Sequence, residues 1–158
     1  MKMCTKIFAR KCNIVNNINL NTFMKDNHLM GLGSGSDFAL EINGEIVAGV
    51  QIKRKNPTNW DISRFCSKQQ TTVIGGFSRL LHFFIKEYKT ESITTFIDRR
   101  YGVGDYLADF GFKLKSCHHS FKWTDTKETF HRMRYPGNTG YDQGLYKIWD
   151  CGQACYIR

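Results

Sequence analysis

The chain has 158 residues, and 41% of them are hydrophobic. Its 12 Phe, 7 Tyr and 3 Trp, with only 2 Pro, exclude a disordered chain and predict one compact domain. No apolar run approaches the roughly 18 residues of a membrane helix, and the basic N-terminus leads into polar sequence. We therefore expect no signal peptide, no membrane contact and a cytoplasmic protein.

Positive charge dominates the composition. The 23 Lys and Arg against 14 Asp and Glu give a net charge of +9, with the excess concentrated in residues 1–55 and 113–158. This pattern predicts a basic face that binds DNA, and a solvated basic surface with no function is the alternative. The residues expected to contact nucleic acid are Arg54, Lys55, Lys68, Arg99, Arg100, Arg132 and Arg134.

A short helix and a hairpin are predicted first along the chain. Asn21 or Thr22 is suited to cap the helix. Two apolar runs, Phe38–Ile42 and Glu45–Ile52, flank an Asn-Gly pair, which is the strongest short-range signal for a β-hairpin.

A strand, a glycine turn, a helix and a second strand follow. Alternating apolar residues predict a strand at 60–66, and a buried-strand pattern covers Ser92–Ile97. Between them, apolar residues from Phe77 to Tyr88 recur at i, i+3, i+4, i+7, i+8 and i+11, which is one stripe of an α-helix. This order predicts a βαβ-like unit with the two strands as neighbours.

The C-terminal third reads as a short helix at 102–110 and then strands. The predicted strand fragments are 112–115, 120–123, 129–135, and 145–149 turning at Gly152 into 155–157. The fold class is α/β or α+β, with a mixed central sheet flanked by helices. We expect a single domain over residues 1–158, with a basic strand extension from about residue 113.

The glycine pair before the long helix is a candidate phosphate site. Gly75 and Gly76 would expose backbone N–H groups at the positive end of the helix, and Ser78 and Arg79 follow them. A turn that needs glycine only for its backbone geometry is the alternative.

Polar residues at the ends of the predicted strands form a second group of candidates. Ligands of parallel-type sheets bind outside the carboxyl ends of strands, where Arg64 and Asp98 lie. Asp98 is either a site residue or a salt-bridge partner. Tyr106 is a candidate proton donor or a packed tyrosine, and His28 fits a capping or packing role. We predict that Arg64, Gly75, Gly76, Ser78, Asp98 and Tyr106 line one cleft.

Six cysteines raise the question of disulfides and zinc. No CxxC pair occurs, and we expect a reducing compartment, so unbridged and metal-free thiols are predicted. A zinc site that uses Cys117, His118, His119, Cys151 or Cys155 is the alternative.

The order of hairpin, strand, glycine turn, helix, strand and the segment Asp105–Phe112 resembles the GNAT acetyltransferase superfamily. The resemblance implies that Gly76-Phe77-Ser78 holds the pyrophosphate of acetyl-CoA or another acyl donor, and that Tyr106 is a general acid. Val73 stands where that family has Arg or Gln three residues before the glycine.

Six segments in order also resemble a phage domain that is fused C-terminal to phage homing endonucleases, and the central part resembles the phage Mom DNA-modification proteins. The segments are 6–12, 27–31, 63–68, 73–81, 97–112 and 146–152. This resemblance implies an anti-restriction role and a pocket formed by Arg64, Ser78, Asp98 and Tyr106.

Three functions remain open at this point. The first is a GNAT-like transferase that modifies a base or amine of DNA, using a flipped base. The second is a DNA-binding or anti-defence module without catalysis, which Val73 favours. The third is an acetyl-CoA-dependent N-acetyltransferase for protein or small molecules, which explains the fold but not the charge.

Overall fold

A computed structural model describes residues 4–158. The chain divides into two compact units, one formed by the residues up to Thr95 together with Arg158, and the other by Phe96–Ile157. The first unit is an α+β arrangement built on a mixed sheet, as the sequence predicts. No helix in residues 4–158 is long and apolar enough to cross a membrane.

The first unit contains the predicted hairpin and βαβ order, with additional strands at its N-terminus. Its elements are β1 (Thr5–Phe8), η1 (Ala9–Lys11), β2 (Asn13–Asn16), α1 (Asn21–Asn27), β3 (Ser36–Ile42), β4 (Glu45–Arg54), β5 (Asn59–Ser67), β6 (Thr71–Ile74), α2 (Gly76–Tyr88) and β7 (Ser92–Asp98), which ends in the second unit.

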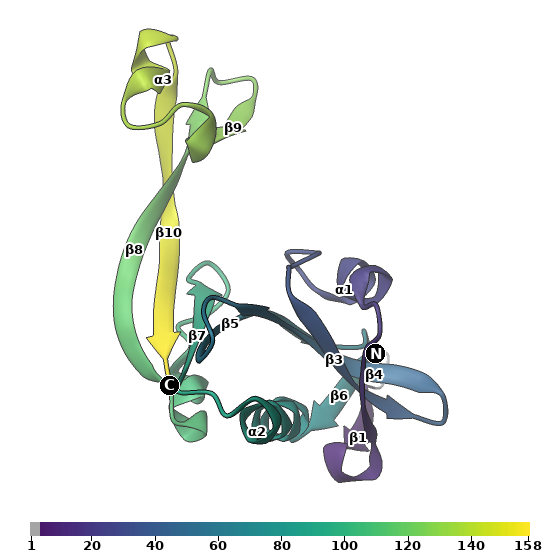
Figure 1. Cartoon of the computed structure of the whole chain (residues 1–158). Coiled ribbons are helices and arrows are strands. Elements are labelled where there is room, and N and C mark those ends of the chain that lie inside the picture. Colours follow the sequence, from purple (N-terminus) through teal and green to yellow (C-terminus); the bar gives the residue numbers. More distant parts are fainter. Residues whose placement is uncertain (1–3) are drawn as a thin grey trace. The chain divides into compact units, whose positions relative to one another are not determined.

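The sheet of the first unit combines antiparallel and parallel pairs. Strands β2, β3, β4 and β5 are antiparallel neighbours in that order, and β5 pairs with β7 in parallel. Figure 1 labels β3, β4, β5 and β7 of this sheet. The parallel pairing joins Asn59–Ile62 to Ser92–Thr95, which confirms the predicted neighbourhood of these strands. Strands β1 and β6 form a separate parallel pair that the sequence analysis did not predict.

The two helices of the first unit pack on opposite faces of its sheet. Phe38 contacts α2, with ring centroids of Phe38 and Phe84 5.5 Å apart. The next residue, Ala39, is buried with Leu20 and Met24 at the start of α1. Because successive residues of a strand point to opposite faces, α1 and α2 cover different sides. The helix α1 starts without a side-chain cap, so the predicted capping by Asn21 or Thr22 is wrong.

The second unit is dominated by a long antiparallel ribbon. Its elements are η2 (Asp105–Phe110), β8 (Lys113–Thr124), β9 (Thr129–His131), η3 (Arg132–Arg134), α3 (Thr139–Asp142) and β10 (Tyr146–Ile157). Figure 1 shows β8 and β10 running side by side, with β9 and α3 near one end of the ribbon.

Three predictions for this unit are wrong. The fragments predicted in 112–123 and 145–157 form two continuous strands, because the chain passes Gly152 through a bulge rather than a turn. There φ is +74°, and a Cβ atom would lie 1.9 Å from the carbonyl oxygen of His118, so only glycine fits. The predicted strand 129–135 ends at His131 and continues as a 3-10 turn. The predicted helix 102–110 is a 3-10 helix that begins at Asp105.

Candidate functional site

The start of α2 forms one side of an open groove. Gly75 precedes the helix with φ +76°, a left-handed conformation that glycine adopts without strain, and no side chain caps the helix. The first N–H groups of an α-helix have no partner within the helix and lie at the positive end of its dipole. The groove therefore has an anion-attracting end.

Basic and polar side chains line this groove together with the apolar residues Phe8, Ala9 and Ile74, and its volume is about 410 Å³. Arg10 comes from η1, and Ser78, Arg79 and His82 come from the first turns of α2. Nη1 of Arg79 donates to the carbonyl oxygen of Ala9 at 2.7 Å, which ties the helix start to η1. Two guanidinium groups and a helix N-terminus thus share one groove, a combination that suits a diphosphate or a similar polyanion.

The two glycines have different local roles. Gly75 supplies the left-handed residue before the helix, and the nearest atom to a Cβ at this position would be 3.9 Å away. At Gly76, a Cβ would lie 3.2 Å from Cγ1 of Val73, so this glycine lets the helix start pack closely. Backbone geometry thus accounts for the pair by itself, and any anion binding depends on the groove around it.

A loop of residues 28–35 is held against β5 where that strand parts from β7. The pairing of the two strands ends at Ile62 and Thr95. Immediately beyond, Oγ of Ser63 donates to the carbonyl oxygen of Ser34 at 2.7 Å, and Nε of Arg64 donates to that of Gly31 at 3.3 Å. Ligand sites of such sheets lie where neighbouring strand ends separate, so this loop lies at a position that suits ligand binding.

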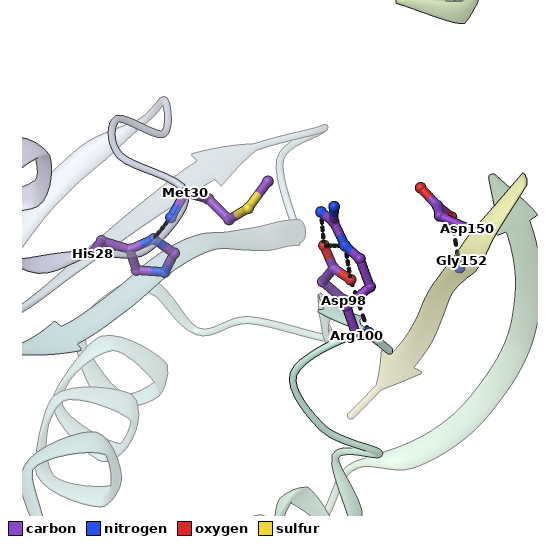
Figure 2. A network of polar contacts seen from close by, with 6 residues as sticks. All are labelled: His28, Met30, Asp98, Arg100, Asp150 and Gly152. Atoms are coloured by element: carbon purple, nitrogen blue, oxygen red, sulfur yellow. Dashed lines mark hydrogen bonds and ion pairs between the residues drawn. The ribbon is translucent and has the colours of Figure 1, made fainter. Parts of the chain in front are cut away.

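His28 lies at the base of the same loop. Its Nδ1 accepts a hydrogen bond from the backbone N–H of Met30 at 3.0 Å (Figure 2). Partial burial, and then the positive charge of Arg64, lower the pKa of His28 below its ordinary value. At neutral pH the ring is therefore uncharged, and because Nδ1 accepts, its proton is on Nε2 and available for donation.

Asp98 and Arg100 form an ion pair at the end of β7, in the second unit (Figure 2). Both the side chain and the backbone N–H of Arg100 donate to the carboxylate, with 3.0 Å from Nε and from the backbone N to Oδ1. The side-chain hydrogen bond is the main cause that lowers the pKa of Asp98. The sequence predicts that Asp98 is either a site residue or a salt-bridge partner, and these contacts make it the salt-bridge partner of Arg100.

Tyr106 lies on η2 in the second unit, with 58% of its surface exposed. Partial burial, and then Tyr156, raise the pKa of its phenol. The neighbouring Tyr156 is engaged, since its hydroxyl donates to the carbonyl oxygen of Val103 at 2.6 Å. Tyr106 is therefore a protonated phenol at neutral pH, as a proton donor must be.

Most of the basic residues predicted to bind nucleic acid already have partners. Three are in ion pairs: Lys55 with Asp61, Lys68 with Glu45, and Arg100 with Asp98. Two donate to backbone carbonyls: Arg54 to those of Asn56 and Pro57, and Arg99 to that of Cys151. Arg132 and Arg134 have no acidic partner within residues 4–158.

The predicted cleft residues fall into both units. The structure brings Gly75, Ser78 and Arg79 together in the groove, with Gly76 buried beside them. Arg64 lies against the loop 28–35, and Asp98 and Tyr106 belong to the second unit. A single cleft lined by all six residues stays a prediction.

Sequence reasoning missed Arg10 and His82 as groove residues. His82 stands four residues after Ser78, so helical spacing places both on one face and offered a signal. Arg10 reaches the groove because η1 meets the start of α2, through a contact between residues 70 positions apart. No local pattern indicates such a contact.

The cysteines show no grouping that would hold a metal. The structure describes all six cysteines without a disulfide bond, and burial raises the pKa of Cys66 to about 11. Among the described residues, no three His, Cys, Asp or Glu side chains come together as metal ligands. Oxidation state and metal content stay predictions.

No protein-family model and no curated protein matches the sequence. Solved structures do match. An acetyltransferase of Bacillus subtilis in complex with CoA aligns at a TM-score of 0.61 and 14% identity, over 93% of this chain and 97% of that chain. A GNAT family acetyltransferase from Elizabethkingia anophelis with acetyl-CoA bound aligns at a TM-score of 0.61 and 12% identity, over 93% of this chain and 97% of that chain. The chain has the GNAT acetyltransferase fold.

A third structure with the GNAT fold is the ribosomal-protein-S18-alanine N-acetyltransferase from Escherichia coli, with a TM-score of 0.55 and 12% identity over 92% of this chain and 90% of that one. At this level of identity the likeness concerns the fold. Val73, which replaces the Arg or Gln expected from the GNAT resemblance, is buried in β6 and pairs with Ile7. Positive charge in the groove comes instead from Arg10 and Arg79.

Proposed function

We propose that the protein is an acyl-CoA-dependent N-acyltransferase and that the diphosphate of its acyl donor binds at the start of α2. The observation that carries the proposal is the groove in which Arg10, Arg79 and the uncapped helix end meet. Two structures with the same fold contain CoA or acetyl-CoA, which supports a donor of this class.

The residues of the groove bind and orient the donor. Arg79 is fixed by its hydrogen bond to Ala9, so its charge is held in place before any ligand arrives. Arg10 packs over the ring of Phe8, with the guanidinium carbon 5.0 Å from the ring centroid. Such preorganised cations and helix N–H groups bind a diphosphate with little loss of side-chain entropy.

The donor supplies an activated thioester. When an amine attacks its carbonyl carbon, a C–N bond forms, the C–S bond breaks, the amine loses a proton and the leaving thiolate takes one up. In this chain, the protonated phenol of Tyr106 is the candidate proton source, as the GNAT resemblance implies. The Nε2–H group of His28 is a candidate donor that orients the acceptor beside Arg64.

Binding of acyl-CoA tests the proposal. Isothermal titration with acetyl-CoA should give a complex that the double variant Arg10→Ala, Arg79→Ala weakens by at least tenfold, because each lost charge-assisted contact is worth roughly 1.5–3 kcal/mol. Lys86→Ala, a change at the opposite end of α2, is the control and should leave the affinity unchanged. No binding by the unaltered protein, or equal losses in both variants, would contradict the proposal.

A second candidate function is the same transfer to an amine of DNA, as the resemblance to Mom proteins implies. The net charge of +9 favours it, because a polyanionic acceptor would be attracted to the protein. Nucleoside digestion and mass analysis of DNA from cells that express the protein would detect a modified base. The modification should disappear with Tyr106→Phe, and an unmodified digest would exclude this acceptor.

A further inference from the structure

The end of the ribbon in the second unit is a three-stranded sheet with two unlike faces. Lys122, Trp123 and Thr124 of β8 pair with β9 on one side and with β10 on the other. Directly opposite residues of antiparallel strands share a face, so the register assigns each side chain to one face or the other. We call this part the tip sheet.

One face of the tip sheet is covered. Trp123 is fully buried, its ring lies edge-on to Tyr141 of α3 at 5.0 Å, and its Nε1 donates to the carbonyl oxygen of Tyr135 at 2.9 Å. Lys147, opposite Trp123, extends its ammonium between this ring and that of Phe121 and donates to Oδ1 of Asn138. The segment 132–142 thus closes this face with aromatic packing.

The other face of the tip sheet is covered only at its hairpin end, where Thr124 is buried and its Oγ1 donates to the carbonyl oxygen of Glu128 at 2.7 Å. Lys122 stands between Ile148 on β10 and His131 on β9 in one cross-strand row, and Tyr146 lies two residues from Ile148 on the same face. Tyr146 is 63% exposed and Ile148 52% exposed. We call the four side chains Lys122, His131, Tyr146 and Ile148 the open face.

Among residues 4–158, no ion pair neutralises the cations of this region, although Asp150 lies two residues beyond Ile148 on the same face and its Oδ1 accepts from the backbone N–H of Gly152. Arg132 follows His131 directly, and no Asp or Glu occurs between Glu128 and Asp142. Among residues 4–158, the second unit has one ion pair, which joins Arg100 to Asp98. Neither Lys122 nor Arg132 therefore has an acidic partner among these residues. Large apolar side chains beside unpaired cations are the features of a surface that binds single-stranded nucleic acid.

We propose that the open face and Arg132 bind a single strand of nucleic acid. Lys122 and Arg132 contact its phosphates, while an unstacked base packs on the ring of Tyr146 and the side chain of Ile148. A strand fits better than an apolar protein partner, because an apolar protein surface would leave Lys122 without counter-charge. The proposal is independent of acyl transfer, since it uses none of the residues in the groove at α2.

Fluorescence anisotropy with a labelled oligodeoxythymidine of about 20 nucleotides tests the proposal, and an oligouridine of equal length tests whether the sugar matters. The double variant Lys122→Glu, Arg132→Glu should weaken binding at least tenfold. It should also reduce the slope of log K against log salt by about 0.7 for each lost phosphate contact. Tyr146→Ala should weaken binding about five- to 150-fold and leave the salt slope unchanged, because stacking involves no counterion release.

Two controls are matched to these changes. Lys86→Glu with Lys89→Glu reverses two exposed charges in the first unit, and Tyr101→Ala removes a ring that is 60% exposed. Neither should change affinity more than about twofold, in line with the small effects usual for exposed positions. All of these positions are exposed, so folding is expected to survive, and circular dichroism checks this.

Three outcomes would overturn the proposal. The first is no binding by the unaltered protein at about 50 mM salt. The second is an equal loss in the variants of the open face and in the controls. The third is self-association in sedimentation experiments that Tyr146→Ala abolishes, which would assign the open face to a second copy of the chain. Loss of acetyl-CoA binding alone would leave this proposal standing, and loss of oligonucleotide binding alone would leave the acyltransferase.

Discussion

His28 connects helix α1 to the loop that follows it through two hydrogen bonds, one to its ring and one to its backbone carbonyl oxygen. Its Nδ1 accepts from the N–H of Met30, and its carbonyl oxygen accepts from the N–H of Gly31 at 2.8 Å. A protonated ring would turn the first contact into a clash of two donors. The shape of the loop therefore depends on a neutral imidazole.

The first prediction concerns the titration of this ring. Its ordinary pKa is 6.5, and the folded protein lowers that value. Below pH 6.5 the unfolded chain binds a proton that the folded chain does not, so His28 makes stability fall as the pH drops from about 7 toward its folded pKa. NMR titration should show a pKa below 6.5, and Arg64→Gln should raise it because a positive neighbour is removed. An unshifted pKa in both proteins would contradict this.

The second prediction separates two glycines with left-handed backbones. Gly75→Ala should lower the free energy of unfolding by about 1–2 kcal/mol, because the new Cβ has space and only the backbone is strained. Gly152→Ala should cost several times more, since its Cβ would overlap the carbonyl oxygen of His118, at 1.9 Å. Urea unfolding measures both values, and similar losses would show that the bulge can relax.

At the scale of elements, helix α3 is held mainly by what it covers. It has four residues, too few for a stable isolated helix, and Gly140 lies directly on the ring of Trp123. A Cβ at Gly140 would lie 2.4 Å from that ring. The helix forms because the tip sheet offers an aromatic surface on which it can pack.

The third prediction follows from this contact. Gly140→Ala should displace α3 and expose Trp123, which is seen as a red shift of tryptophan fluorescence and a loss of near-ultraviolet circular dichroism. Gly137→Ala is the matched control, because nothing lies within 4 Å of its added Cβ, although its positive φ adds backbone strain. Fluorescence that is unchanged in Gly140→Ala would contradict the proposed packing.

Local patterns in the sequence predict the elements of the first unit well. The Asn-Gly turn at residues 43 and 44 and the apolar stripe of α2 are signals that neighbouring residues carry by themselves. Strands β1 and β6 are not predicted from the sequence, because each has only four residues and their parallel pairing joins distant segments. In the second unit, β8 and β10 read as fragments since polar residues and Gly152 interrupt their apolar pattern.

The candidate site is predictable to a similar degree. The glycine pair, Ser78 and Arg79 belong to one helix start, so spacing alone groups them. The position of Arg10 could not be predicted, because η1 reaches the groove through a tertiary contact. The pairing of Asp98 with Arg100 could not be predicted either, because it depends on the backbone conformation after β7. Tyr106 is exposed where a packed tyrosine is more usual, which no local pattern indicates.

At the scale of the whole molecule, the two units differ in how much of their structure is buried. The centre of the first unit contains the fully buried side chains of Leu20, Met24, Ala39 and Phe84. The tip sheet of the second unit is packed on one face only. Local stability follows the density of buried contacts.

The fourth prediction is a gradient of hydrogen exchange. Amides in β3, β4 and the paired part of β5 should exchange slowest, and those of β9 and the adjoining end of β10 should exchange many times faster. Saturating oligonucleotide should slow exchange in β9 and β10 if the open face binds it. Uniform protection along both units would contradict the gradient.

The short length of β9 has a consequence for the solubility of the protein. It pairs only with Lys122–Thr124, so within residues 4–158 the outer edge of β8 from Lys113 to Phe121 has no neighbouring strand. Such an edge can accept a strand from another molecule and start aggregation. Lys113, Lys115 and the two exposed histidines at 118 and 119 supply polar and charged side chains along it, and the bulge at Gly152 bends the ribbon. Part of the chain's positive charge therefore disfavours edge-to-edge pairing of β8 between molecules, and so opposes aggregation into fibres.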